Sequence, residues 1–263
     1  MTCCANPDRV SIGCDPLTQP ISRSIQNLRL VRARIEAAPQ PGGQPVALLA
    51  VTKSVPNDVA RELALAGQRD LAENRVEVFE SKVGALSDLD VRWHFIGHIQ
   101  RNKARRIVAL ATVVHSVDSL RLLHTLERMA AELGRELEIF LQVNATGEEQ
   151  KHGLPPAQVP EAVAALDACP HLKLLGLMAM GPTGADPLET RRAFEATATL
   201  ARKIEDDPAL APRLAAGRCQ LSMGMSADLE LAIAAGSNLV RVGRALFQSL
   251  PGEALNDPAP GLD

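Results

Sequence analysis

The sequence predicts a single-domain (β/α)8 barrel of the TIM type, preceded by an extra N-terminal helix. Short apolar or β-branched runs alternate with longer helical patterns along most of the 263 residues, which is typical of a parallel sheet covered on both faces. Eight such units in a chain of this length favour a closed barrel over an open doubly wound sheet. No G-x-G-x-x-G motif follows the first strand, which further disfavours a dinucleotide-binding fold.

The first element is an amphipathic helix over residues 21–38. Ile21, Ile25 and Leu28 begin a series of apolar residues at steps of three and four, and the sequence PQPGG ends it. We expect the barrel to occupy residues 21–250, with residues 1–20 and 251–263 as tails. Eight runs are interpreted as strands: VALLAVTK (46–53), RDLAEN (69–74), VRWHFIGH (91–98), TVVHSVD (112–118), LEIFLQVN (137–144), LKLLGLMAM (172–180), CQLSMGMS (219–226) and NLVRVG (238–243).

Composition narrows the class of protein. The net charge is −3 and the pI is about 6.1, so no basic field suggests a nucleic acid or an anionic membrane as partner. No apolar stretch could span a bilayer, and the N-terminus lacks the layout of a signal peptide, so we expect a cytoplasmic protein. Cys3, Cys4 and Cys14 match no recognised zinc pattern and are expected in an unstructured tail.

Polar side chains stand at the expected carboxyl ends of the strands, where barrels of this kind place their functional groups. Few of these end positions are apolar, and a polar ring over a packed interior suits a ligand site. The residues at the ends are Lys53, Asn74, His98, Asp118, Asn144, Met178, Ser222 and Arg241.

Lys53 ends the first apolar strand. Poor solvation beside such a strand favours the neutral amine, which condenses with carbonyl compounds to form a Schiff base. The alternative is a lysine that reaches solvent or pairs with a carboxylate such as Glu73.

The ends of the last two strands suggest an anion site. Ser222, Gly224 and Ser226 surround a turn into a helix, and Gly243 joins the eighth strand to another. Barrels often bind phosphate between these two loops on backbone N–H groups, although the glycines could serve only tight turns. Arg241 shares the strand parity of Gly243 and should point into the barrel, toward a ligand or a structural carboxylate. A reactive lysine, a phosphate site and an arginine together indicate a phosphorylated aldehyde as ligand.

Several motifs resemble those of the pyridoxal phosphate homeostasis proteins, whose fold is similar to the N-terminal barrel domain of alanine racemase. They are AVTKSVP, AENRVEVFESK, WHFIGHIQRNK, HSVDSLRL, GLMAMGP and LSMGMSADLELAIAAGSNLVRVG, in order from about Val46 to Phe247. The resemblance implies that Lys53 carries pyridoxal 5′-phosphate (PLP) as a Schiff base. It implies further cofactor-binding residues: Asn74 beside the ring, Arg241 at the pyridine nitrogen, and Ser222, Met223, Gly243 and Arg244 around the phosphate.

Some positions depart from the family pattern. Arg244 stands where threonine is common, Ala72 where glycine is usual and Glu77 where glutamine is usual. Gln248 replaces a usual glycine, and His152 replaces a small serine.

The chain contains no tyrosine, so it cannot supply the tyrosine base of an alanine racemase. By resemblance, Arg241 would also disfavour protonation of the ring nitrogen and weaken the ring as an electron sink. We therefore expect a monomeric PLP carrier with little or no turnover, without catalytic or metal-binding residues, which holds PLP and releases it to apo-enzymes. Two alternatives remain: a PLP-dependent racemase or lyase that uses His94 or His98 as its second base, and a Schiff-base aldolase in which Lys53 attacks a sugar phosphate directly.

Overall fold

The computed structural model describes residues 22–41, 43–148, 151–182, 184 and 186–248. Within them the chain forms a closed barrel in which strands β1 to β8 pair in sequence order and β8 pairs with β1, all in parallel. The predicted (β/α)8 barrel is therefore confirmed. The two expected tails, residues 1–20 and 251–263, lie outside the described residues.

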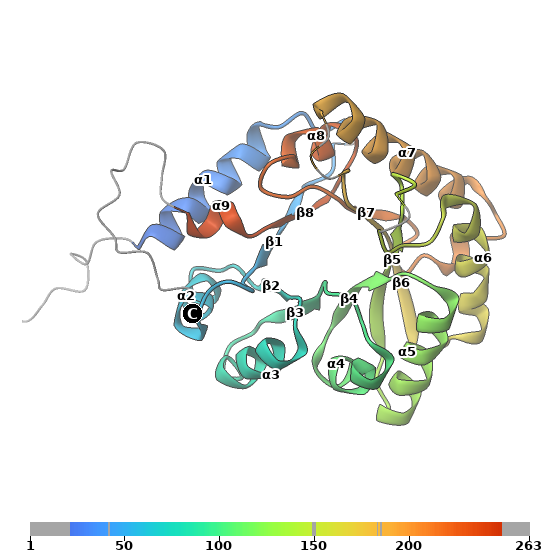
Figure 1. The fold of residues 1–263 in the computed structure, drawn as a ribbon, viewed down its shortest axis with the longest axis horizontal. Helices are drawn as coiled ribbons and strands as arrows, with labels where there is room; N and C mark the ends of the chain where they lie inside the picture. The colour runs from blue at the N-terminus through green and yellow to red at the C-terminus, as the bar shows by residue number, and fades with distance from the viewer. Residues whose placement is uncertain (1–21, 42, 149–150, 183, 185, 249–263) are drawn as a thin grey trace, which may run out of the picture.

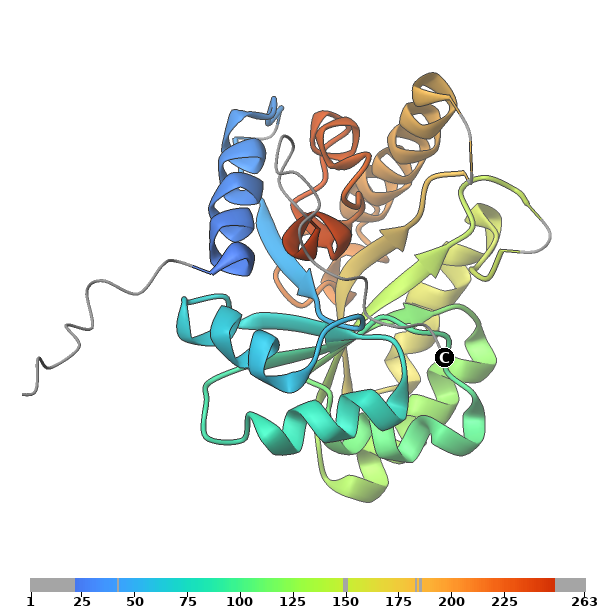
Figure 2. The same ribbon diagram turned by 60° about the vertical axis from the view of Figure 1, so that its left-hand side comes forward.

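The barrel strands are short, and helices surround them in both ribbon views (Figure 1, Figure 2). The strands are β1 (Ala47–Val51), β2 (Asp70–Glu73), β3 (Arg92–Phe95), β4 (Val113–Val117), β5 (Leu137–Val143), β6 (Leu172–Ala179), β7 (Gln220–Ser222) and β8 (Leu239–Val242). The helices are α1 (Arg23–Ala37), α2 (Asn57–Leu65), α3 (Val76–Ala85), α4 (Ala104–Leu110), α5 (Leu120–Leu133), α6 (Val159–Ala164), α7 (Pro187–Asp206), α8 (Leu229–Ala234) and α9 (Arg244–Phe247).

The extra N-terminal helix, α1, packs beside the last short helix, α9 (Figure 1). Ser22 caps α1, because its hydroxyl accepts a hydrogen bond from the backbone N–H of Ile25. The Asn27 side-chain amide, buried in this contact, donates to the backbone carbonyls of Leu246 at 3.2 Å and Gln248 at 2.8 Å. These bonds join the first and last described elements beside the strand pair β1–β8.

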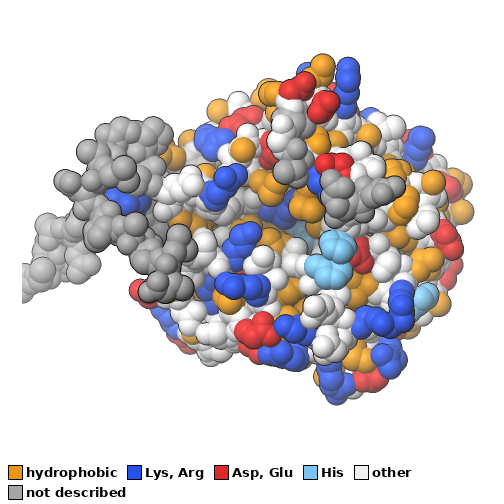
Figure 3. Space-filling view, in the orientation of Figure 1, with side chains coloured by type: hydrophobic (Ala, Val, Ile, Leu, Met, Phe, Trp, Pro, Cys, Tyr) orange, Lys and Arg blue, Asp and Glu red, His pale blue; other side chains and the backbone are white. Residues whose placement is uncertain are grey.

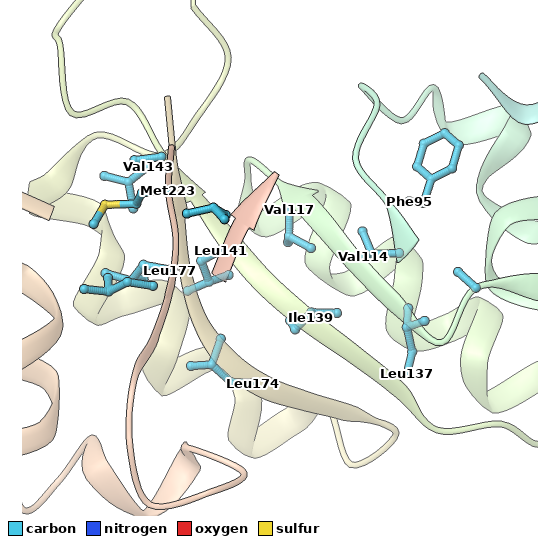
Figure 4. Close-up of a cluster of buried hydrophobic side chains, with 14 of the residues drawn as sticks. Phe95, Val114, Val117, Leu137, Ile139, Leu141, Val143, Leu174, Leu177 and Met223 are labelled. Carbon is cyan, nitrogen blue, oxygen red and sulfur yellow. The ribbon is translucent and has the colours of Figure 1, made fainter. Parts of the chain in front are cut away.

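Alternation along each strand separates two apolar layers. On β8, Leu239 belongs to the cluster inside the barrel, whereas Val240 and Val242 belong to the layer between strands and helices. Arg241 therefore points into the barrel, as its parity predicts. Figure 4 shows part of the outer layer, with side chains of β4, β5 and β6 packed together. The inner cluster consists of Leu49, Val51, Ala72, Val113, Phe140, Leu175, Met178 and Leu239.

The seventh strand is much shorter than the predicted run 219–226, because it ends at Ser222. The chain turns at Gly224, whose φ of +88° lies in the left-handed region. A Cβ at this position would also stand 2.6 Å from the Cβ of Ala232 in α8. This turn carries Met225 and Ser226 to the mouth of the barrel, which decides the site described below.

No helix among the described residues is both long and apolar enough to cross a membrane.

Candidate functional site

A pocket of about 350 Å³ opens at the carboxyl ends of the strands, within the size range of small-molecule sites. A larger hollow of about 570 Å³ lies between the loop after β5 and α7. It contains none of the predicted cofactor-binding residues, so we place the site in the smaller pocket. The smaller pocket is lined by Val51, Lys53, Asn74, Ile96, Gly97, His98, Met178, Met180, Met225, Ser226, Arg241, Gly243 and Arg244.

The charges in this lining are of one sign. Lys53, Arg241 and Arg244 contribute cationic groups, and no carboxylate belongs to the set of lining residues. The pocket also contains a buried acceptor without a partner, because Asn74 Oδ1 makes no hydrogen bond in the structure. A buried polar atom of this kind is costly unless something bonds to it. The pocket therefore suits an anionic ligand that also carries a hydrogen-bond donor.

Lys53 lies two residues beyond the end of β1 and is exposed. Lys53 is therefore more accessible to solvent than the apolar strand before it suggests. It also does not form the ion pair with Glu73 that was the alternative. The Glu73 carboxylate instead bonds to the ammonium of Lys82, with 2.6 Å between Oε1 and Nζ, and to the hydroxyl of Thr52 at 2.7 Å. The side chains of Lys82 and Glu73 are only 1% and 0% exposed. Lys82 also donates to the Thr52 carbonyl, so this buried pair fixes the backbone next to Lys53.

Arg241 ends a chain of hydrogen bonds that runs through the barrel interior. Its Nη1 donates to Ser222 Oγ at 2.9 Å, and Ser222 Oγ lies 2.9 Å from His115 Nδ1. His115 Nε2 lies 2.9 Å from His94 Nδ1, and His94 Nε2 lies 2.9 Å from Asp70 Oδ1. A guanidinium only donates and a carboxylate only accepts, so with both histidines neutral one proton arrangement satisfies every contact. In that arrangement each hydroxyl or ring N–H donates toward Asp70, which fixes the tautomer of both rings.

Burial supports this assignment of charge. Desolvation lowers the pKa of His94 and lowers that of His115 well below its usual value. Burial also lowers the pKa of Arg241 to about 10, so the guanidinium remains a cation at neutral pH. Its Nη2 donates to the Ala179 carbonyl at 3.1 Å. Arg241 is thus a fixed cation at the floor of the pocket.

Ser222 and Met223, which the resemblance implied as phosphate contacts, are not among the residues that line the pocket. Ser222 is fully buried, its hydroxyl bonds to His115 and Arg241, and it does not line the pocket. Met223 lies in the outer apolar layer, where Figure 4 shows it near Leu177. Ser226 lines the pocket instead, because the chain turns at Gly224. The sequence already showed Ser226 in this turn, but its choice over Ser222 depended on where β7 ends.

The structure separates the two histidines considered as a second base. His94 is 1% exposed and bonded within the barrel interior, away from the pocket lining. His98 lines the pocket with Lys53. Ser119 caps the helix that follows Asp118, because its hydroxyl accepts from the backbone N–H of Leu122. Asp118 faces His98 at the barrel mouth.

Chemically, the site offers an amine at its rim, a fixed guanidinium at its floor and the hydroxyl of Ser226 in the loop after β7. Figure 3 shows lysine, arginine and histidine side chains gathered near the centre of one face of the molecule. An amine near a cationic pocket can bind the carbonyl group of an anionic aldehyde covalently.

Comparisons with known proteins identify the family and the fold. Residues 25–251 match the family "Alanine racemase, N-terminal domain". The pyridoxal phosphate homeostasis protein of Pseudomonas aeruginosa is 40% identical over 230 residues, which cover 86% of this chain and 96% of that protein. PipY of Synechococcus elongatus, solved with PLP bound, is 36% identical with a TM-score of 0.74, covering 86% of this chain and 100% of that one. An alanine racemase of Clostridium difficile shares the fold alone, at 16% identity and a TM-score of 0.66 over 87% of this chain and 58% of that one.

Proposed function

The chain belongs to the pyridoxal phosphate homeostasis protein family, and on that premise we propose that it binds PLP at the barrel mouth. It would take part in the intracellular homeostasis and delivery of PLP, with little or no catalytic turnover. The observation that carries this proposal is the pocket lining, which combines Lys53 with two further cations, no carboxylate and the unpartnered Asn74 Oδ1. The anionic phosphate of PLP suits the cations, and its aldehyde suits the amine of Lys53.

Four residues of the pocket, at the end of β1 and in the loops after β7 and β8, have roles in this proposal. Lys53 would hold the aldehyde carbon as a Schiff base, which is the chemistry that PLP supplies when bound. Ser226, Gly243 and Arg244 line the part of the pocket formed by the loops after β7 and β8, where barrels commonly bind phosphate. A guanidinium at position 244 can replace a hydroxyl as phosphate donor.

Arg241 supports a carrier more than an enzyme. It is held by Ser222 and Ala179 from below, so its positive charge is fixed at the floor of the pocket. A fixed cation beside the pyridine nitrogen would keep this nitrogen unprotonated and weaken the ring as an electron sink. Lys53 is exposed, which leaves its amine open to exchange with solvent and with other amines.

The test is reconstitution of the purified protein with PLP, followed by absorption spectroscopy and borohydride reduction. We expect a visible Schiff-base band, and we expect peptide mapping to place the reduced label on Lys53. Lys53→Ala should abolish the band, whereas Lys103→Ala, which changes a lysine outside this pocket, should retain it. A chain that shows no band, or that carries the label on another lysine, would contradict the proposal.

One observation favours a second candidate function, a PLP-dependent racemase or lyase. His98 lines the same pocket as Lys53 and could serve as the second base. Exchange of the α-proton of amino acids in deuterium oxide separates the two functions. The carrier predicts no exchange above that of free PLP, and the enzyme predicts exchange that His98→Gln removes.

A further inference from the structure

His98, Asp118 and His152 form a cluster at the barrel mouth, which we name the rim cluster. They come from the loops after three neighbouring strands, β3, β4 and β5. Asp118 Oδ2 lies 3.4 Å from His98 Nδ1 and 3.8 Å from His152 Nδ1. One ligand atom from each residue lies within 4.8 Å of the others. We propose that the rim cluster binds a divalent transition-metal ion, with Zn²⁺ as the ion that suits it best.

The spacing suits a tetrahedral ion. Ligand atoms about 2.0–2.1 Å from Zn²⁺ lie roughly 3.3 Å apart in that geometry. The Asp118–His98 separation of 3.4 Å already matches this value. The Asp118–His152 separation of 3.8 Å exceeds it by roughly 0.5 Å, which a small side-chain rotation can supply. The two imidazole rings are stacked, with centroids 4.1 Å apart, and their side chains are 49% and 61% exposed, so they are free to turn.

The backbone beneath the rim cluster is well anchored. Gln142 Nε2 donates to the His152 carbonyl at 2.8 Å, and Ser116 Oγ donates to the Gly97 carbonyl at 2.6 Å, next to His98. The Ser119 hydroxyl donates to Asp118 Oδ1 at 3.2 Å, which leaves Oδ2 toward the histidines. A hydrogen bond to the other oxygen of a ligating carboxylate is a common feature of metal sites.

The ligand types select the metal. Two imidazoles and one carboxylate favour Zn²⁺ and its neighbours over Mg²⁺ and Ca²⁺, which prefer all-oxygen sites. Three protein ligands leave the fourth position to water, and the exposure of the histidines gives that water access. Among the described residues, the ion pairs of Asp118 are with these two histidines, so no lysine or arginine competes for its carboxylate. The alternative is a simple ion pair between Asp118 and a protonated histidine.

The experiment is a calorimetric titration of the metal-free, full-length protein with ZnCl2. It is done in the absence of PLP. Because Cys3, Cys4 and Cys14 could also bind zinc, the titration is done with all three replaced by serine. We expect one ion per chain. His152→Ser, which restores the residue usual in the family, and Asp118→Asn should each weaken binding by about tenfold or more. The control is His124→Ser, which changes an exposed histidine of α5 and should leave the affinity unchanged.

A titration with CoCl2 gives an independent measurement, because a tetrahedral cobalt site absorbs visible light. The absorption should appear with the unsubstituted rim cluster and be lost in His152→Ser, with circular dichroism confirming that the variant is folded. The proposal is overturned if no zinc binds at millimolar concentration, or if both rim substitutions leave the affinity unchanged.

Discussion

Replacing Lys82 by methionine removes one charge of an ion pair that lies inside the protein. The Nζ of Lys82 is 2.6 Å from Glu73 Oε1, and the two side chains are 1% and 0% exposed. The variant would leave a buried carboxylate that keeps its hydrogen bond from the Thr52 hydroxyl but has lost its counter-charge. Breaking a buried pair in this way costs about 3–5 kcal/mol, which is a large part of the roughly 5–15 kcal/mol that stabilises a typical domain.

The assay is equilibrium unfolding in urea, monitored by circular dichroism and by the fluorescence of Trp93. Trp93 is the one tryptophan of the chain and packs edge-on against Phe79 of α3, the helix that carries Lys82. Lys173→Met makes the same substitution in an exposed pair, where Lys173 and Glu136 are 45% and 64% exposed. This control should cost at most about 1 kcal/mol.

A second variant separates the lost charge from the lost packing. Glu73→Leu combined with Lys82→Met removes both charges, so no buried ion remains, and we expect it to be more stable than Lys82→Met alone. The reasoning is refuted if Lys82→Met lowers the free energy of unfolding no more than Lys173→Met does.

Two further predictions concern the barrel interior and the pocket. The folded state holds His94 and His115 neutral with lowered pKa values, whereas the unfolded chain takes up protons near pH 6.5. Stability should therefore fall as the pH drops below about 6.5, by up to about 1.4 kcal/mol per pH unit for each histidine. Urea midpoints between pH 7.5 and 5.5 measure this, and His115→Gln should flatten the profile. Gly97→Ala should weaken PLP binding and lower stability, because its Cβ would stand 2.0 Å from the Asn74 carbonyl oxygen. Gly84→Ala is the matched control, because nothing lies within 4 Å of the added carbon. If the two variants changed PLP binding and stability equally, the steric explanation for Gly97 would be contradicted.

The sequence was sufficient for the barrel and for the direction of individual side chains along a strand. Alternation is a local property, so the inward position of Arg241 follows from its neighbours Val240 and Val242 alone. The place of Lys53 at the barrel mouth follows in the same way from the end of the first apolar run.

What a buried polar atom bonds to was decided only by the tertiary structure. Glu73 pairs with Lys82, and Asp70 connects to Arg241 through three side chains from three strands. That Ser226 rather than Ser222 lines the pocket depends on where β7 ends, and the rim cluster forms only because three loops meet. These contacts join residues far apart in the chain and form only when the barrel closes. A local hydrophobic pattern of period 2 or 3.6 contains no information about which distant residues will meet.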